Sequence, residues 1–136
     1  MIERRKSIRV ECEFPTSFRD LDSTNPARIE NAVVKNISRG GVKLRVDDFV
    51  PIQDRLYIYL HLPTHHTIEV QLKLAWIIEL PHLKKYEAGA RFMDMKQEDE
   101  VAIQGFQYQA LLDRMPFRPN IVKDLLRDDP DPGVAA

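Results

Sequence analysis

The sequence has little of several features that define whole classes of protein. Its single cysteine, Cys12, excludes a disulfide-stapled scaffold and a cysteine-rich zinc module, and we interpret it as a core residue. No run approaches the roughly 18 consecutive apolar residues of a membrane-spanning helix, so we expect no membrane span. The opening residues are charged, with no apolar run after them, so we expect no signal peptide. These absences indicate a cytoplasmic protein.

A large excess of charge of one sign is also missing. The net charge is −1, so the chain as a whole has no general attraction to nucleic acid or to an anionic membrane. Charge is nevertheless uneven, because residues 1–10 hold four cations (Arg4, Arg5, Lys6 and Arg9) and one acid, whereas residues 124–132 hold four aspartates and one arginine. We therefore expect any anion-binding end to be the N-terminal one.

What is present is the composition of one folded domain. The 136 residues are 43% hydrophobic and 30% charged, close to globular averages. Apolar and polar residues alternate with period two in several segments, as in strands with one buried face. The segments are 8–14, 42–46, 56–62 and 68–74, with weaker candidates at 28–36 and 86–93. About six short strands at this spacing predict a small β-barrel or sandwich, with residues 63–66 as a hairpin tip.

The pattern becomes helical after Met93. Residues 98–114 have helical spacing at Ile103, Phe106 and Ala110, and Asp94 and Gln97 offer capping chemistry. Pro116 and Pro119 should end this helix, and residues 120–127 are expected to form a further short helical turn. The acidic, proline-containing end is expected to be disordered. The predicted organisation is therefore a flexible arm at 1–9, a folded unit at 10–114 and a tail at 115–136.

Common enzyme signatures are absent: the sequence has no Walker loop, no Rossmann fingerprint and no HExxH helix. Two acidic runs, at 47–48 and 98–100, fall at a strand end and a helix start, where solvation and the helix dipole explain them. His61, His65 and His66 straddle the hairpin tip without a fourth ligand at metal-site spacing, and are interpreted as surface residues. We therefore expect no catalysis, no metal and no cofactor.

Two short motifs remain. The first is R-x-x-x-R at Arg5 and Arg9, with Arg4 in front, and the second is N-x-S-x-x-G from Asn36 to Gly41. Taken singly, the first is a solvated basic arm and the second a turn in which Gly41 takes a positive φ.

In this order, followed by short strands and a Gly-Ala-Arg-Phe run before a helix, the two motifs resemble the PilZ domain family over residues 3–112. Its members bind the bacterial second messenger cyclic di-GMP. The resemblance implies a six-stranded antiparallel β-barrel with a C-terminal α-helix.

The resemblance also implies the ligand-binding residues. A ligand with two phosphates and two guanines suits guanidinium groups, which match phosphate or the O6/N7 edge of guanine and can stack on a base. Arg5 and Arg9 are the primary candidates, with Arg4 as a third guanidinium. Asn36 and Ser38 share one face of an extended segment and can hydrogen-bond a guanine edge or position an arginine.

The glycines of the second motif, Gly40 and Gly41, would leave room for ligand and backbone N–H groups. Arg39 and Arg91 would add positive potential. Trp76, Gly89 and Phe92 are interpreted as barrel packing, outside the site.

The expected function is that of a cyclic di-GMP receptor whose N-terminal arm orders on ligand binding and signals to a protein partner controlling motility, polysaccharide, adhesion or virulence. The first alternative is a nucleotide-independent adaptor that binds a protein through the barrel. The second, a barrel for single-stranded nucleic acid, is disfavoured because aromatic residues are 8% of the chain and the net charge is near zero.

Overall fold

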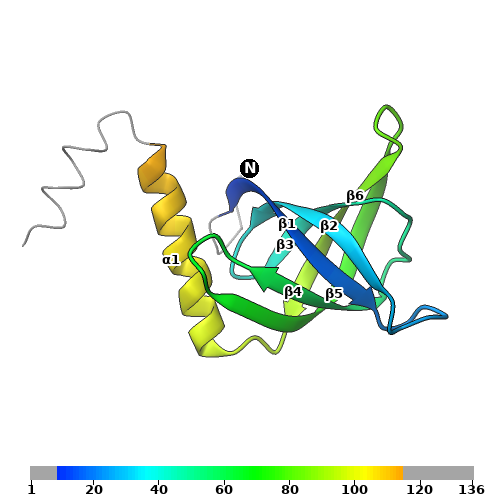
Figure 1. The fold of residues 1–136 in the computed structure, drawn as a ribbon, viewed down its shortest axis with the longest axis horizontal. Coiled ribbons are helices and arrows are strands. Elements are labelled where there is room, and N and C mark those ends of the chain that lie inside the picture. The colour runs from blue at the N-terminus through cyan, green and yellow to red at the C-terminus, as the bar shows by residue number, and fades with distance from the viewer. Residues whose placement is uncertain (1–8, 115–136) are drawn as a thin grey trace, which may run out of the picture.

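The computed structural model describes residues 9–114. It contains six strands and one helix, β1 (Val10–Asp20), β2 (Ile29–Ile37), β3 (Gly41–Val46), β4 (Arg55–His61), β5 (Thr67–Leu80), β6 (Lys85–Met93) and α1 (Gln97–Asp113). The strands close into an antiparallel barrel in the order β1-β2-β3-β6-β5-β4, with β4 pairing back onto β1 (Figure 1). The expected six-stranded barrel with a C-terminal helix is confirmed.

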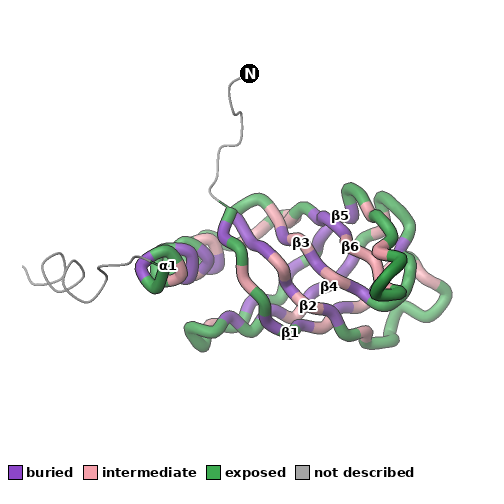
Figure 2. The backbone as a smooth tube through the Cα atoms, turned by 90° about the horizontal axis from the view of Figure 1, so that it is seen from above, coloured by how far each residue is buried: buried purple, intermediate pink, exposed green. Residues whose placement is uncertain are grey.

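Period-two alternation builds the core, because successive side chains of a strand point to opposite faces of the sheet. Buried and more exposed positions alternate along the strands around the barrel (Figure 2). The largest fully buried side chains are Phe18, Ile37, Leu44, Leu56, Ile58, Leu60, Ile68, Leu72, Leu74 and Ile103. Burying each such side chain contributes roughly 1.5–3 kcal/mol. Seven of these ten come from the segments that the alternation marked as strands; Phe18, Ile37 and Ile103 lie outside them.

Three β-bulges interrupt this alternation. The register shifts between Glu11 and Phe14 in β1, between Val34 and Asn36 in β2, and between Leu74 and Trp76 in β5. A bulge adds one residue to one strand, so it changes the face on which the following side chains emerge. The bulges in β2 and β5 bear on the site described below.

Helix α1 lies at one end of the barrel in both views (Figures 1 and 2). Its Phe106 ring packs edge-on against Phe14 with 5.7 Å between centroids, and the buried Gln107 donates a hydrogen bond to the carbonyl of Ile37 at 3.2 Å. The expected capping by Asp94 and Gln97 is wrong: the N-cap is Lys96, and it makes no side-chain cap bond. Acidic residues in the first turn still favour this end through the helix dipole.

Other expectations need smaller corrections. Cys12 lies at the β1 bulge and is only half-buried against the edge of the core, where burial raises the pKa of its thiol to about 11. Asp99 does not face water; it is buried, and its Oδ1 lies 2.9 Å from Nε2 of His66. The hairpin tip predicted at 63–66 is confirmed: it lies between the end of β4 at His61 and the start of β5 at Thr67, with His65 at φ 72°.

No helix within residues 9–114 is long and apolar enough to cross a membrane. The expectations for the arm at 1–8, including Arg4 and Arg5, and for the tail at 115–136 lie outside the described residues.

Candidate ligand-binding site

The β2 bulge sets the direction of the second motif. Val34 pairs with the inward-facing Leu44, but after the extra residue Asn36 pairs with Lys43 and so emerges on the outer face of the barrel. Asn36 is nevertheless only 5% exposed, and its Nδ2 donates to the Glu11 carboxylate at 3.5 Å. Without the bulge, Asn36 would continue the inward-facing series of Ala32 and Val34. The bulge instead places its polar side chain on the outer wall of the barrel.

Ser38 organises a tight turn between β2 and β3. Its backbone N–H donates to the carbonyl of Gly41 at 2.9 Å, and its Oγ accepts from the N–H of Gly40 at 3.1 Å. The Gly40 carbonyl in turn accepts from the N–H of Phe92 at 2.9 Å, which fastens the turn to β6. Accepting one bond leaves the Ser38 hydroxyl with a hydrogen that it can donate to a ligand.

Gly41 is required by close approach of two strands. The expected positive φ is wrong, because no glycine among the described residues has one. Instead, a Cβ at Gly41 would lie 2.1 Å from the carbonyl oxygen of Ala90, since Gly41 pairs with Arg91 across β3 and β6. A side chain here would push the two strands apart, whereas a Cβ at Gly40 would meet only the Ser38 Oγ at 3.8 Å.

Trp76 is not a core residue, which corrects the sequence interpretation. The bulge at Ala75 breaks the inward series of Leu72 and Leu74, and Trp76 pairs with Gly89 on the outer face, 38% exposed. A Cβ on Gly89 would lie 2.2 Å from the indole Nε1, so the indole ring rests directly against the Gly89 backbone. The absence of a side chain at Gly89 therefore leaves the space that the Trp76 ring occupies.

These elements surround one pocket of about 340 Å³. It is lined by Arg9, Ser38, Gly40, Gly41, Val42, Ala75, Trp76, Gly89, Ala90 and Arg91. The structure thus brings together four of the seven proposed ligand-binding residues. Asn36 stands behind the lining with Glu11, and Arg4 and Arg5 lie outside the described residues.

Sequence reasoning left Trp76 and Gly89 out of this site. Of the two arginines expected to add potential, Arg91 lines the pocket and Arg39 does not.

The charges of this pocket suit an anion. Arg9 and Arg91 both line it, and Arg91 pairs across the strands with Lys73, a like-charge neighbour that costs stability unless an anion lies nearby. The exposed indole offers a flat π-face, and the glycines give access to the backbone. Together these groups can hold a phosphate and stack an aromatic base.

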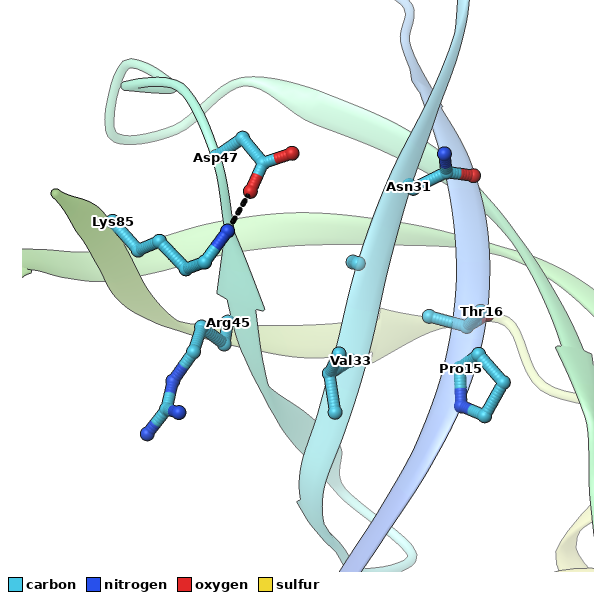
Figure 3. Close-up of a pocket in the computed structure, with 8 residues that line it drawn as sticks. Pro15, Thr16, Asn31, Val33, Arg45, Asp47 and Lys85 are labelled. Carbon is cyan, nitrogen blue, oxygen red and sulfur yellow. Dashed lines mark hydrogen bonds and ion pairs between the residues drawn. The ribbon is translucent and has the colours of Figure 1, made fainter. Parts of the chain in front are cut away.

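Two other pockets are less suited to such a ligand. One, of about 310 Å³ on the outer face of β1–β3, pairs its Lys85 with Asp47 at 2.5 Å (Figure 3). Its Arg45 lies 3.8 Å from Glu87, which it shares with Lys43. Each of its two cations thus already has a carboxylate nearby. The other is lined by Glu69, Asp94 and Asp99 against Lys96, and its excess of carboxylates disfavours an anion.

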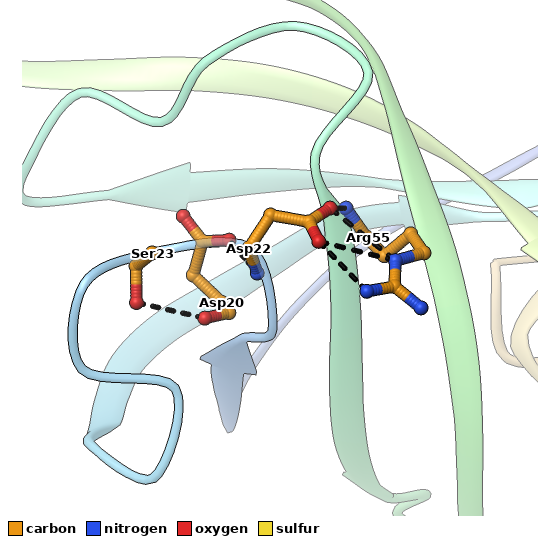
Figure 4. Close-up of polar contacts among 4 residues, drawn as sticks. All are labelled: Asp20, Asp22, Ser23 and Arg55. Atoms are coloured by element: carbon orange, nitrogen blue, oxygen red, sulfur yellow. Dashed lines mark hydrogen bonds and ion pairs between the residues drawn. The ribbon is translucent and has the colours of Figure 1, made fainter.

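A carboxyl cluster lies at the start of β4 (Figure 4). Asp22 accepts from the Arg55 backbone N–H at 2.7 Å and from its guanidinium at 2.8 Å, which ties the β1–β2 loop to β4. Burial, with Asp20 beside it, raises the pKa of Asp54 to about 6. Among residues 9–114 no group of three or more histidine, cysteine or acidic side chains could hold a metal. The role of this cluster is structural: it holds the β1–β2 loop against β4.

The chain is thus a small β-barrel domain, closed by six antiparallel strands, with a cationic and aromatic pocket on its outer wall. More particularly, the chain belongs to the PilZ domain family, whose model matches residues 3–109. No curated protein sequence matches the chain.

Solved structures share the fold at low identity. Bacillus subtilis MotI/DgrA, an inhibitor of motility, is 19% identical with a TM-score of 0.69, covering 83% of this chain and 54% of that one. The PilZ domain of Escherichia coli YcgR with c-di-GMP is 11% identical with a TM-score of 0.64, covering 93% and 100%. Klebsiella MrkH is 21% identical with a TM-score of 0.62, covering 82% and 52%. The chain thus spans about half the length of several structures that it matches.

Proposed function

We propose that this chain is a non-catalytic receptor for cyclic di-GMP in the cytoplasm. The observation that carries the proposal is the pocket that joins Arg9, Ser38 and Gly41 of the two motifs to Trp76 and Arg91. YcgR and MrkH, both similar in fold, have been solved with this dinucleotide.

Each part of the pocket has a task that the ligand requires. The guanidinium of Arg91 would bind a phosphate or the O6/N7 edge of a guanine, both of which match its planar fork. The indole of Trp76 would stack on a guanine, because every base has a π-face. The Ser38 hydroxyl would donate to the ligand while its oxygen keeps the turn closed.

The basic arm would complete the site. Arg9 already lines the pocket, and Arg4 and Arg5 are only five and four residues before it in the sequence, so an arm that closed on the ligand would bring their guanidinium groups to it. Ligand phosphates would neutralise these like charges and order the arm, at an entropic cost incurred on binding. The ordered arm would then form part of a new surface for a downstream protein partner.

The effect of binding would pass to another protein. Control of motility, polysaccharide, adhesion or virulence is the process class we propose, without a nucleic acid polymer as ligand. The competing adaptor hypothesis predicts the same fold without a nucleotide.

Calorimetric titration of cyclic di-GMP into the purified protein tests the proposal. Arg91→Ala should weaken binding about 12- to 150-fold, since hydrogen bonds to charged groups contribute roughly 1.5–3 kcal/mol. Arg5→Ala and Ser38→Ala should also weaken it. Arg39→Ala is the matched control, because this exposed arginine of the same turn does not line the pocket. GTP and cyclic di-AMP should not compete. A folded wild type that binds no cyclic di-GMP would refute the receptor and leave the adaptor.

A further inference from the structure

Helix α1 presents apolar side chains on the face turned away from the barrel. Val101, Tyr108 and Leu111 are between 43% and 57% exposed. Their spacing of seven and three residues places them on one side of the helix, opposite the buried Ile103 and Phe106. Leu112 lies on the same side and is buried. Scattered exposed apolar residues are ordinary, but an aligned series on one helix face marks a contact surface.

Gly105 lies on the same face, between Val101 and Tyr108. A glycine inside a helix costs about 1 kcal/mol relative to alanine. Nothing lies within 4 Å of a Cβ built at Gly105, so packing within the described part of the chain does not require a glycine there. A glycine flanked by exposed apolar residues permits close approach of another segment's backbone, which would explain the cost.

The chain just beyond α1 has the matching pattern. Residues 120–127 place Ile121, Val122, Leu125 and Leu126 within about 140° of one helical turn, at 100° per residue, and Lys123, Asp124 and Arg127 on the other side. Eight residues are too few for a stable isolated helix in water. Such a segment becomes helical only by burying its apolar face against a surface.

We propose that residues 119–127 dock as a helix on the outer face of α1, antiparallel to it. The five residues 114–118 match the length of connections in helical hairpins, and Pro119 suits a first helical turn. At 1.5 Å per residue the segment covers roughly 12 Å, which reaches from Asp113 back to Gly105. Leu125 then lies near Tyr108, whereas Val101 lies one turn beyond the end of the segment.

The proposed surface belongs to a helix that also supports the ligand site. Gln107 bonds the carbonyl of Ile37, one residue before Ser38, and the Arg114 guanidinium bonds the carbonyl of Glu11, two residues after Arg9. At 100° per residue, Gln107 and Arg114 fall about 100–120° around the helix from Tyr108, so the docked segment would lie on the face of α1 next to these two attachments. This inference does not depend on the identity of the ligand.

A double-mutant cycle in the full-length chain tests the docking. Tyr108→Ala and Leu125→Ala should each lower the midpoint of urea unfolding, and the double variant should lose less than the sum of the two, because both remove the same contact. Val101→Ala with Leu125→Ala is the matched control and should be additive.

Three outcomes overturn the proposal. They are no effect of Leu125→Ala, additive losses for the Tyr108 pair, and losses that depend on protein concentration together with a dimer in light scattering. The last would make a second copy the occupant.

Discussion

Gly89→Ala should weaken ligand binding while leaving the barrel folded. The new Cβ would lie 2.2 Å from Nε1 and 2.4 Å from Cε2 of Trp76, whereas carbon contacts are favourable at about 3.5–4.0 Å. The ring must therefore retreat by more than about 1 Å. Trp76 can do so because it is partly exposed at the surface, so the strand backbone need not move.

The magnitudes separate the two effects. Stacking of a base on an aromatic side chain is worth about 1–3 kcal/mol, so a displaced indole should weaken cyclic di-GMP binding about 5- to 150-fold. Replacing glycine by alanine in an extended strand lowers the conformational entropy of the unfolded chain, which raises the free energy of unfolding by about 0.4–1 kcal/mol. This gain offsets much of the stability lost with the ring packing. The melting temperature should therefore change little.

Calorimetry and tryptophan emission measure both consequences. Trp76 is the chain's one tryptophan, so its emission reports this site alone, and Gly89→Ala should shift it towards that of a solvated indole. Gly89→Ala with Trp76→Ala should bind no more weakly than Trp76→Ala alone. Wild-type affinity together with wild-type emission in Gly89→Ala would refute the reasoning.

Three further predictions concern stability. Gly41→Ala should cost about 1–3 kcal/mol in urea unfolding through overpacking against Ala90, whereas Gly40→Ala should cost far less; equal losses would contradict the close approach. Because the fold raises the pKa of Asp54 from 3.8 to about 6, the folded state favours the protonated carboxyl, and this contribution to stability is lost as pH rises through 6. Asp54→Asn should therefore raise the melting temperature more at pH 7.5 than at pH 5, and an equal rise at both would contradict it. Gln107→Leu should lower the free energy of unfolding by about 1 kcal/mol through loss of the bond to Ile37, and an unchanged urea midpoint would count against that support.

The strands could be predicted because each buries one face. Alternation in segments such as Leu56–Leu62 follows directly from the geometry of a half-buried sheet. The helix after Met93 could be predicted from the spacing of its apolar residues. Its N-cap could not, because Lys96 makes no side-chain hydrogen bond and so matches no capping motif.

The site was harder to predict where it depends on registers between strands. Leu72, Leu74 and Trp76 continue a perfect period of two, so one extra residue at Ala75, which reverses the direction of the tryptophan, leaves no mark on the pattern. The need for Gly41 arises from the Ala90 carbonyl on another strand, and the burial of Asp99 from His66, 33 residues away. Short motifs carried the local part of the site, and long-range pairing supplied the rest.

A nuclear magnetic resonance titration of the ¹⁵N-labelled protein with cyclic di-GMP tests the central claim most directly. The account predicts saturable shifts of the Trp76 indole N–H and of the backbone amides of Gly40, Gly41, Gly89 and Arg91, with GTP producing none of them. Shifts confined to the β1–β3 pocket around Val33 and Arg45, or no shifts at all, would contradict it.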